Sequence, residues 1–169
     1  MRPPSEQARF EQFFFNEPTC KRLTTIALQF KRPLFLCMPS LAMQFQERGR
    51  SFLLFDRDQR FSHLDGYRQF DLLAPFFVEE SFDALFVDPP FSNIQMEQLF
   101  GAIDTVNGFQ GTDHIFICHV REKESAIVSH YGSHGIVRFP RHLGYQTVSQ
   151  ETQRRIFLFG PREFLKYDS

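Results

Sequence analysis

The sequence predicts an α/β fold: a doubly wound, mostly parallel sheet of seven strands with helices on both faces. Short, fully apolar runs alternate with segments of helical periodicity, which is the pattern of successive βαβ units. Three successive predicted strands end on an acid, namely Asp56, Asp71 and Asp88. No helical segment separates the last two predicted strands, so an antiparallel C-terminal hairpin is expected.

Helices and strands alternate through the first half of the chain. Asn16 is a favourable helix N-cap, and apolar residues recur after it at helical spacing. Pro39 is typical of a first helical turn and Gly49 of a helix end. The expected elements are, in order, a helix over 16–30, a strand over 33–38, a helix over 39–49 and strands over 51–56 and 67–71.

The second half repeats the alternation and then closes on strands alone. Ser92 is a candidate N-cap for a third helix, and Gly132 is a natural end for a fourth. The expected elements are a strand over 82–88, a helix over 92–106, a strand over 114–120, a helix over 121–132 and strands over 135–139 and 154–160.

Composition narrows the class of protein. The chain has 19 basic and 20 acidic residues, which is not the charge of a protein that holds nucleic acid by bulk electrostatics. Its three cysteines show no paired spacing, and the N-terminus has no apolar signal sequence, so a cytoplasmic protein with reduced thiols is expected. No apolar run is long enough for a membrane span. Residues 1–10 are expected to form a flexible arm and 11–169 a single domain.

The strand-ending acids predict a binding site. In open, doubly wound sheets, ligands bind beyond the carboxyl ends of the strands, where the strand order reverses. Asp56, Asp71 and Asp88 are therefore expected to line one rim of the sheet.

The turn Asp88-Pro89-Pro90-Phe91 is the most specific pattern in the chain. Proline keeps the preceding residue out of helical conformation and removes a backbone donor, so the turn should be rigid and rich in acceptors. The Asp88 carboxylate and the Pro89 carbonyl suit an amine with two N–H groups, and Phe91 could lie against a flat base or a cation. The alternative is a plain strand-to-helix turn capped by Ser92. The place of the turn at the end of the fourth predicted strand favours the binding site.

These residues resemble a known family. Asp-Pro-Pro-Phe matches the [DN]-P-P-[YFW] motif of amino-group methyltransferases that use S-adenosylmethionine. Over about residues 11–160 the chain is similar to the probable N6-adenine methyltransferase family, which includes the lysine methyltransferase of elongation factor 1A and a ribosomal RNA adenine methyltransferase that bears a zinc knuckle. The matching segments are the opening at 12–15, LCMPSLAMQF, LLFDRDQRF, SFDALFVDPPF and the Pro-Arg-His at 140–142. The opening departs from the family in having Phe14 where tryptophan is usual.

The resemblance implies a Rossmann-like class I S-adenosylmethionine-dependent methyltransferase with S-adenosyl-L-methionine as cofactor and no metal. Asp56 would accept hydrogen bonds from the ribose hydroxyls, and Asp71 would lie near the adenine amino group. The loop CMPSLAM lacks the usual glycines. The implied catalytic residues are Asp88, Pro89, Pro90 and Phe91. The implied cofactor-binding residues are Cys37, Pro39, Ser40, Asp56, Asp71 and Asp88. The implied substrate-binding residues are Phe13, Phe14, Phe15, Phe91, Arg141 and His142.

The expected function is methyl transfer to an amino nitrogen. Near-neutral charge, the absence of an RNA-binding module and the Pro-Arg-His segment favour the lysine side chain of a protein such as a translation elongation factor. The motif itself favours the alternative, N6 of adenine in RNA or DNA. A second alternative is a non-catalytic scaffold of this fold, favoured by the missing glycines and opposed by the intact motif. Whether a partner chain supplies specificity stays open.

Overall fold

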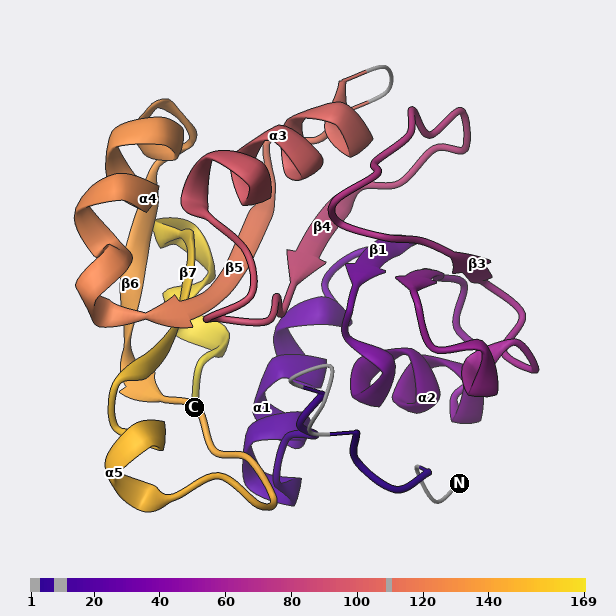
Figure 1. Cartoon of the computed structure of the whole chain (residues 1–169), viewed down its shortest axis with the longest axis horizontal. Coiled ribbons are helices and arrows are strands. Elements are labelled where there is room, and N and C mark those ends of the chain that lie inside the picture. The colour runs from indigo at the N-terminus through magenta and orange to yellow at the C-terminus, as the bar shows by residue number, and fades with distance from the viewer. Residues whose placement is uncertain (1–3, 8–11, 109–110) are drawn as a thin grey trace.

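A seven-stranded sheet runs through the molecule with the strand order β3-β2-β1-β4-β5-β7-β6 (Figure 1). The structure is a computed structural model that describes residues 4–7, 12–108 and 111–169. Neighbouring strands are parallel except at β7, which runs antiparallel to both β5 and β6. The predicted mostly parallel sheet with an antiparallel C-terminal hairpin is confirmed.

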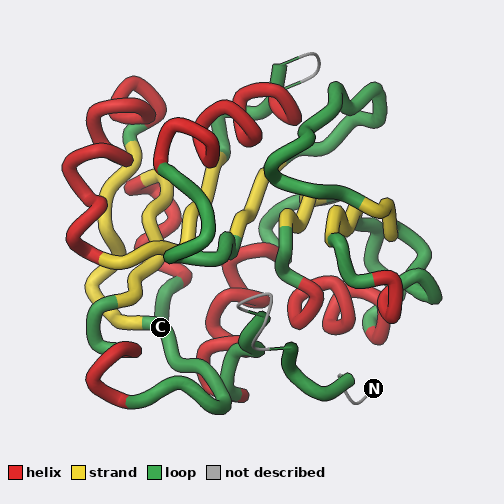
Figure 2. The backbone as a smooth tube through the Cα atoms, viewed as in Figure 1, coloured by secondary structure: helices red, strands yellow, loops and turns green. Residues whose placement is uncertain are grey.

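The elements along the chain follow the predicted alternation (Figure 2). The strands are β1 (Pro33–Leu36), β2 (Leu53–Asp56), β3 (Tyr67–Gln69), β4 (Ala84–Val87), β5 (Ile115–Val120), β6 (Ile136–His142) and β7 (Ile156–Pro161). The α-helices are α1 (Glu17–Ala27), α2 (Pro39–Glu47), α3 (Met96–Asn107), α4 (Glu124–Tyr131) and α5 (Gln150–Gln153). Short 3₁₀ helices are η2 (Gln59–Phe61), η3 (Arg121–Lys123), η4 (Gly132–His134) and η5 (Arg162–Tyr167).

Helices cover both faces of the sheet, as predicted. α1 and α2 pack on one face, and α3 and α4 pack on the other (Figure 1). Because both faces are covered, β1, β2 and β4 are buried along their whole length, which explains why they are apolar runs rather than alternating ones. Phe86 of β4 and Phe116 of β5 stack at the centre of one layer, with their ring centroids 4.3 Å apart.

The third helix begins later than predicted. Ser92 is not its cap: residues 91–94 form a turn, and α3 starts at Met96. The Gln95 backbone N–H donates to Oε1 of Gln98 (3.0 Å), which satisfies a backbone donor at the helix start. The extra turn keeps Ile94 at the sheet edge, on the wall of a cavity described below.

The ends of β3 and β6 also differ from the prediction, because of how these strands pair with their neighbours. β3 ends at Gln69, before Asp71, because its only partner strand is β2, and the pairing stops where Asp56 meets Gln69. β6 extends to His142, so the Pro-Arg-His segment lies within the strand rather than after it. The pairing of β6 with β7 shifts register between Arg138 and His142, around Pro140, which has no N–H for the ladder.

Two predicted elements near the C-terminus are shorter. The helix predicted over 121–132 divides into η3 and α4. β7 begins at Ile156 because residues 150–153 form α5, which the sequence did not indicate.

The described part of the N-terminal segment forms hydrogen bonds with other parts of the protein. Of the arm predicted over 1–10, residues 1–3 and 8–10 lie outside the described part of the chain. The Glu6 carboxylate accepts from the backbone N–H of Phe14 (2.8 Å) and from the Thr147 hydroxyl. The Ser5 carbonyl accepts from Nη1 of Arg60 (3.1 Å). The described part of the arm is thus bonded to three separate segments, and its flexibility stays a prediction.

Candidate active site

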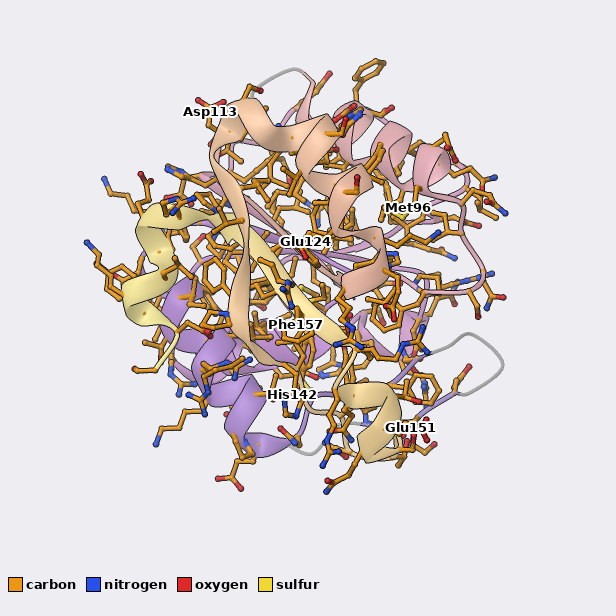
Figure 3. All side chains as sticks on the ribbon, turned by 90° about the vertical axis from the view of Figure 1, so that its left-hand side faces the viewer. Met96, Asp113, Glu124, His142, Glu151 and Phe157 are labelled. Carbon is orange, nitrogen blue, oxygen red and sulfur yellow. The ribbon has the colours of Figure 1, made fainter. Side chains whose placement is uncertain are left out.

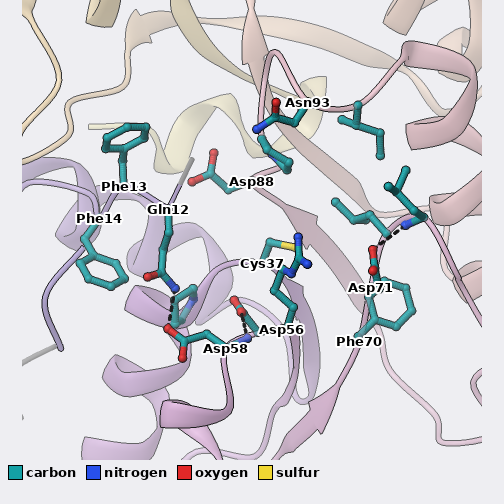
Figure 4. A pocket seen from close by; sticks show the side chains of 16 residues that line it. Gln12, Phe13, Phe14, Cys37, Asp56, Asp58, Phe70, Asp71, Asp88 and Asn93 are labelled. Carbon is teal, nitrogen blue, oxygen red and sulfur yellow. Dashed lines mark hydrogen bonds between the residues drawn. The ribbon is translucent and has the colours of Figure 1, made fainter. Parts of the chain in front are cut away.

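A cavity of about 390 Å³ lies beyond the carboxyl ends of β1, β2 and β4 (Figure 4). This volume is typical of small-molecule sites. The strand order reverses between β1 and β4, so the cavity occupies the switch point of the sheet. Its lining residues are Gln12, Phe13, Phe14, Cys37, Pro39, Asp56, Arg57, Asp58, Phe70, Asp71, Leu72, Leu73, Asp88, Pro90, Asn93 and Ile94.

Parallel pairing brings the strand-end residues together. The Asp88 N–H donates to the Leu36 carbonyl (3.1 Å), and the Cys37 N–H donates to the Phe55 carbonyl (2.9 Å). Cys37 directly follows β1, Asp88 directly follows β4 and Asp56 is the last residue of β2, so the three lie at the same end of three adjacent strands. The three acids that the sequence placed on one rim, including Asp71 in the turn after β3, all line the cavity.

Asp56 is nearly enclosed at the end of β2. Its side chain is buried, which raises the pKa of the carboxyl to about 6, although a hydrogen bond from the Asp58 backbone opposes the shift. That bond runs from the Asp58 N–H to Oδ1 of Asp56 (2.8 Å). Asp56 also lines the cavity, and a carboxylate oxygen can accept more than one hydrogen bond, so it can accept from a ligand hydroxyl.

Asp58 links the N-terminal segment to the cavity wall. Its carboxylate pairs with the Arg60 guanidinium (2.7 Å) and accepts from Nε2 of Gln12 (2.9 Å). Burial raises the pKa of Asp58, but the bonds from Arg60 and Gln12 outweigh it and lower the pKa overall. Asp58 is therefore a structural anion that holds Gln12 against the cavity.

Asp88 lies on the cavity wall directly after β4. Burial raises the pKa of its carboxyl to about 8, and a hydrogen bond from Tyr145 works against the shift. The Tyr145 hydroxyl donates to Oδ1 of Asp88 (2.9 Å). A carboxyl at a cavity wall whose pKa is raised this far is a candidate for a functional role.

Asp88 should make the stability of the ligand-free chain fall as pH rises. Its folded-state pKa of about 8 exceeds the ordinary value of 3.8, so the folded state keeps a proton that the unfolded chain has released. The protonated Asp88 carboxyl contributes fully to the free energy of unfolding below about pH 4, and this contribution is lost progressively up to about pH 8. In urea denaturation, the Asp88→Asn variant should gain stability over the wild type as pH rises through this window. A stability difference that does not change with pH would contradict the assignment.

The loop after β1 makes its turn without glycine. Cys37 has φ +58°, and it is the one non-glycine residue among those described with positive φ. This conformation costs an L-residue about 1–2 kcal/mol, so the loop stores strain at the cavity wall. Pro39, at the start of α2, lines the cavity, whereas Ser40 is buried behind it. Burial also raises the pKa of the Cys37 thiol well above its usual range, so the thiol stays neutral.

The predicted substrate aromatics divide into two groups. Phe13 and Phe14 line the cavity. Phe15 faces the core, where its ring lies 4.9 Å from that of Tyr145. Phe91 does not line the cavity. Its ring centroid lies 5.2 Å from that of His119 and 6.4 Å from that of Tyr145, and both pairs are in an edge-to-face arrangement.

The remaining predicted residues lie off the cavity. Arg141 and His142 are exposed at the end of β6, where His142 pairs with Phe157 (Figure 3). Their backbone carbonyls accept from Nη2 of Arg22 (3.3 and 3.1 Å). Pro89 is buried beneath the turn, and only Pro90 of the two prolines lines the cavity.

His119 is a buried neighbour of the motif. The Val120 N–H donates to its Nδ1 (2.9 Å), so the neutral ring carries its proton on Nε2. Burial lowers the pKa of His119 to about 4, which keeps the ring uncharged. Within the described structure, Nε2 has no hydrogen-bond partner, and the ring supports Phe91 from behind.

Sequence reasoning missed several residues of the site. Asp58 and Asn93 follow predicted site residues closely, so their spacing was an available signal. Tyr145 had no such signal, because it lies far along the chain from Asp88 and reaches it only through the fold. The missed lining residues are Gln12, Arg57, Asp58, Phe70, Leu72, Leu73, Asn93 and Ile94.

The cavity fits S-adenosyl-L-methionine. Asp56 offers a carboxylate oxygen for ribose hydroxyls, and apolar side chains flank it for an adenine ring. In Figure 4, Phe70 and Asp71 lie toward one end of the cavity, and Phe13 and Asp88 toward the other. Acidic side chains around the cavity suit a sulfonium cation. Within the described residues, no cluster of His, Cys, Asp or Glu side chains could hold a metal ion.

Solved structures, methyltransferases among them, share this fold. The N-methyltransferase NodS from Bradyrhizobium japonicum, in complex with S-adenosyl-L-homocysteine, is 16% identical, with a TM-score of 0.58, over 93% of this chain and 91% of that chain. Mtq2 of E. cuniculi, in its complex with Trm112, is 15% identical, with a TM-score of 0.55, over 89% of this chain and 98% of its own. Thermoplasma acidophilum 1320 is 15% identical, with a TM-score of 0.55, over 90% of each chain. The predicted class I methyltransferase fold is confirmed.

The sequence matches no curated protein. It does match a protein family over nearly its whole length. No helix within the described residues is long and apolar enough to cross a membrane. The model of the family described as probable N6-adenine methyltransferase matches residues 6–168. The chain therefore belongs to the probable N6-adenine methyltransferase family and is an S-adenosylmethionine-dependent methyltransferase.

Proposed function

We propose that the protein methylates the side-chain amine of a lysine in a protein such as a translation elongation factor. The charge of the cavity wall carries this proposal. Four aspartates and one arginine, Arg57, line the cavity. Asp58 is paired with Arg60, and burial raises the pKa of Asp88 to about 8, so Asp56 and Asp71 are the acids left to give the wall its negative charge. Such a wall attracts a cationic amine and repels the phosphates of a nucleic acid. The fold supports the idea, since the Mtq2–Trm112 complex is responsible for the methylation of a translation termination factor.

Residues at one end of the cavity would hold the methyl donor. Asp56 would accept from the ribose hydroxyls, and Asp71 from the adenine amino group. Pro39 would bring the N-terminus of α2, whose N-cap Met38 makes no side-chain capping hydrogen bond, beside the ligand. The bound cofactor supplies an electrophilic methyl group on a sulfonium.

Residues at the other end would receive the amine. A lysine ammonium has a pKa of about 10.4 and cannot attack until it loses a proton. Burial raises the pKa of Asp88 to about 8, so its ionised form would take that proton more readily than an ordinary aspartate, and the reaction should speed up as pH rises toward 8.

The aromatic residues of the opening would contain the lysine chain. Phe13 and Phe14 form part of the cavity wall, so they can contact the methylene groups and face the charged end. This contact keeps water from the amine, which favours its neutral and reactive form.

The second candidate function is N6-methylation of adenine. The description of the matching family favours it. Here Phe13 and Phe14 would stack on a base turned out of its helix, and Asp88 would only accept hydrogen bonds from a neutral amino group.

Labelled methyl transfer separates the two substrates. The full chain is incubated with S-adenosylmethionine carrying a labelled methyl group and a cell lysate, which also provides a partner chain should one be needed. We expect protease, not nuclease, to release the label, and acid hydrolysis to yield methyl-lysine. The Asp88→Ala variant controls for other methyltransferases in the lysate. Label recovered as N6-methyladenine after nuclease digestion would overturn the lysine proposal.

A further inference from the structure

We propose that Tyr145 is a positioning residue that orients the Asp88 carboxylate for the incoming amine. The proposal rests on the proposed function and adds to it a residue outside the sequence motif. Its basis is the hydrogen bond from the Tyr145 hydroxyl to Oδ1 of Asp88 (2.9 Å), which joins residues 57 positions apart.

The Tyr145 side chain is held from several directions. Its backbone forms an antiparallel bridge with Phe15, and its carbonyl accepts from Nε2 of Gln153 (3.0 Å). The next residue, Gln146, donates its N–H to the Phe14 carbonyl (2.9 Å). The side chain is only 3% exposed. A hydroxyl on so fixed a ring constrains the carboxyl that it contacts.

The hydrogen bond gives the two carboxyl oxygens of Asp88 different roles. Oδ1 of Asp88 accepts from Tyr145, so Oδ2 is the oxygen left to accept from the substrate amine. A donor to the ionised form favours that form, so the Tyr145 hydroxyl lowers the pKa of Asp88 against the larger upward effect of burial. Burial raises the pKa of Tyr145 well above its usual range, so the phenol keeps the proton that it donates.

Other titratable groups near Asp88 do not compete for this role. Burial raises the pKa of the Cys37 and Cys118 thiols well above their usual range, so both stay neutral. His119, behind Phe91, also stays neutral, because burial lowers its pKa. Asp56, at the end of β2 and separated from β4 by β1, offers no donor to Asp88 in its ionised form. Tyr145 is the only hydrogen-bond donor to the Asp88 side chain among the bonds described.

The test removes the hydroxyl and keeps the ring. In Tyr145→Phe, the Asp88 pKa should rise by about one unit or more, since a hydrogen bond to a charged group is lost. Carbon-13 NMR of the full chain labelled at aspartate carboxyls measures this pKa, and loss of a signal in Asp88→Asn assigns it. Methyl transfer to lysate acceptors should fall about 10-fold at pH 7 and recover in part at higher pH.

Tyr131→Phe is the matched control. The Tyr131 hydroxyl donates to Oδ1 of Asp104 (2.8 Å), and its ring is equally buried, on the α3 and α4 side of the sheet. This change should leave both the Asp88 titration and methyl transfer unaltered. If Tyr145→Phe behaves like Tyr131→Phe in both measurements, the proposal is overturned.

The experiment can be interpreted even if the lysine assignment fails or Tyr145→Phe does not fold. The Asp88 titration needs no substrate, so it tests Tyr145 even if the lysine assignment fails. Should Tyr145→Phe not fold, a wild-type chain made with 3-fluorotyrosine replaces it. The more acidic phenol should lower the Asp88 pKa, and an unchanged pKa would count against the proposal.

Discussion

The Asp88→Ala variant is expected to transfer methyl groups about 10³-fold more slowly than the wild type while still binding S-adenosylmethionine. The Asp88 carboxyl lies at the end of the cavity proposed for the amine, where it can accept an amine hydrogen and, once ionised, take a proton. Its removal leaves the ribose end of the cavity, around Asp56, intact. Initial rates with labelled cofactor and calorimetric titration of the cofactor test the two halves of this expectation. Wild-type turnover in the variant would remove Asp88 from the mechanism.

Asp88→Asn then separates the two candidate substrates. An amide oxygen still accepts a hydrogen bond from the neutral amino group of adenine, but it cannot take a proton from a lysine ammonium. If the substrate is lysine, Asn at this position should be nearly as inactive as Ala. Retention of more than about a tenth of wild-type activity would instead favour adenine, because acceptance of a hydrogen bond would then suffice.

Asp56→Ala is expected to weaken S-adenosylmethionine binding about 100-fold. Each hydrogen bond between a ligand hydroxyl and a buried charged oxygen contributes about 1.5–3 kcal/mol, and Asp56 is the acid that ends β2 at the cavity wall. Calorimetry with the cofactor gives the dissociation constant directly. Asp65→Ala is a suitable control, since that exposed carboxylate bonds Gln46 rather than the cavity. An unchanged dissociation constant in a folded Asp56→Ala chain would contradict the ribose assignment.

The strands and the strand-end acids could be predicted because they depend on local chemistry. A strand buried on both faces is apolar throughout, and a ligand-binding acid at its end stands next to it in the sequence. Both features can therefore be recognised within a few residues. The late start of α3 was not predictable from Ser92, because the turn at 91–94 and the polar contacts of Gln95 compete with it.

The substrate residues show the limit of this reasoning. Arg141 and His142 belong to a segment that resembles the family, and the strand order brings their backbone to the same edge of the sheet as Asp88. That order also inserts β5 and β7 between β4 and β6, so the two side chains lie exposed and away from the cavity. Sequence order along the chain cannot show such a separation.

The amino-acid sequence by itself determined the mostly parallel sheet, the rim of acids and the Asp-Pro-Pro-Phe turn, because each is written in adjacent residues. Only the tertiary structure decided which aromatic rings face the cavity, how Gln12 is held by Asp58, and that Tyr145 donates to Asp88. These contacts join distant segments, and they form only when the strand order and the packing of both helical layers have set the distances between them.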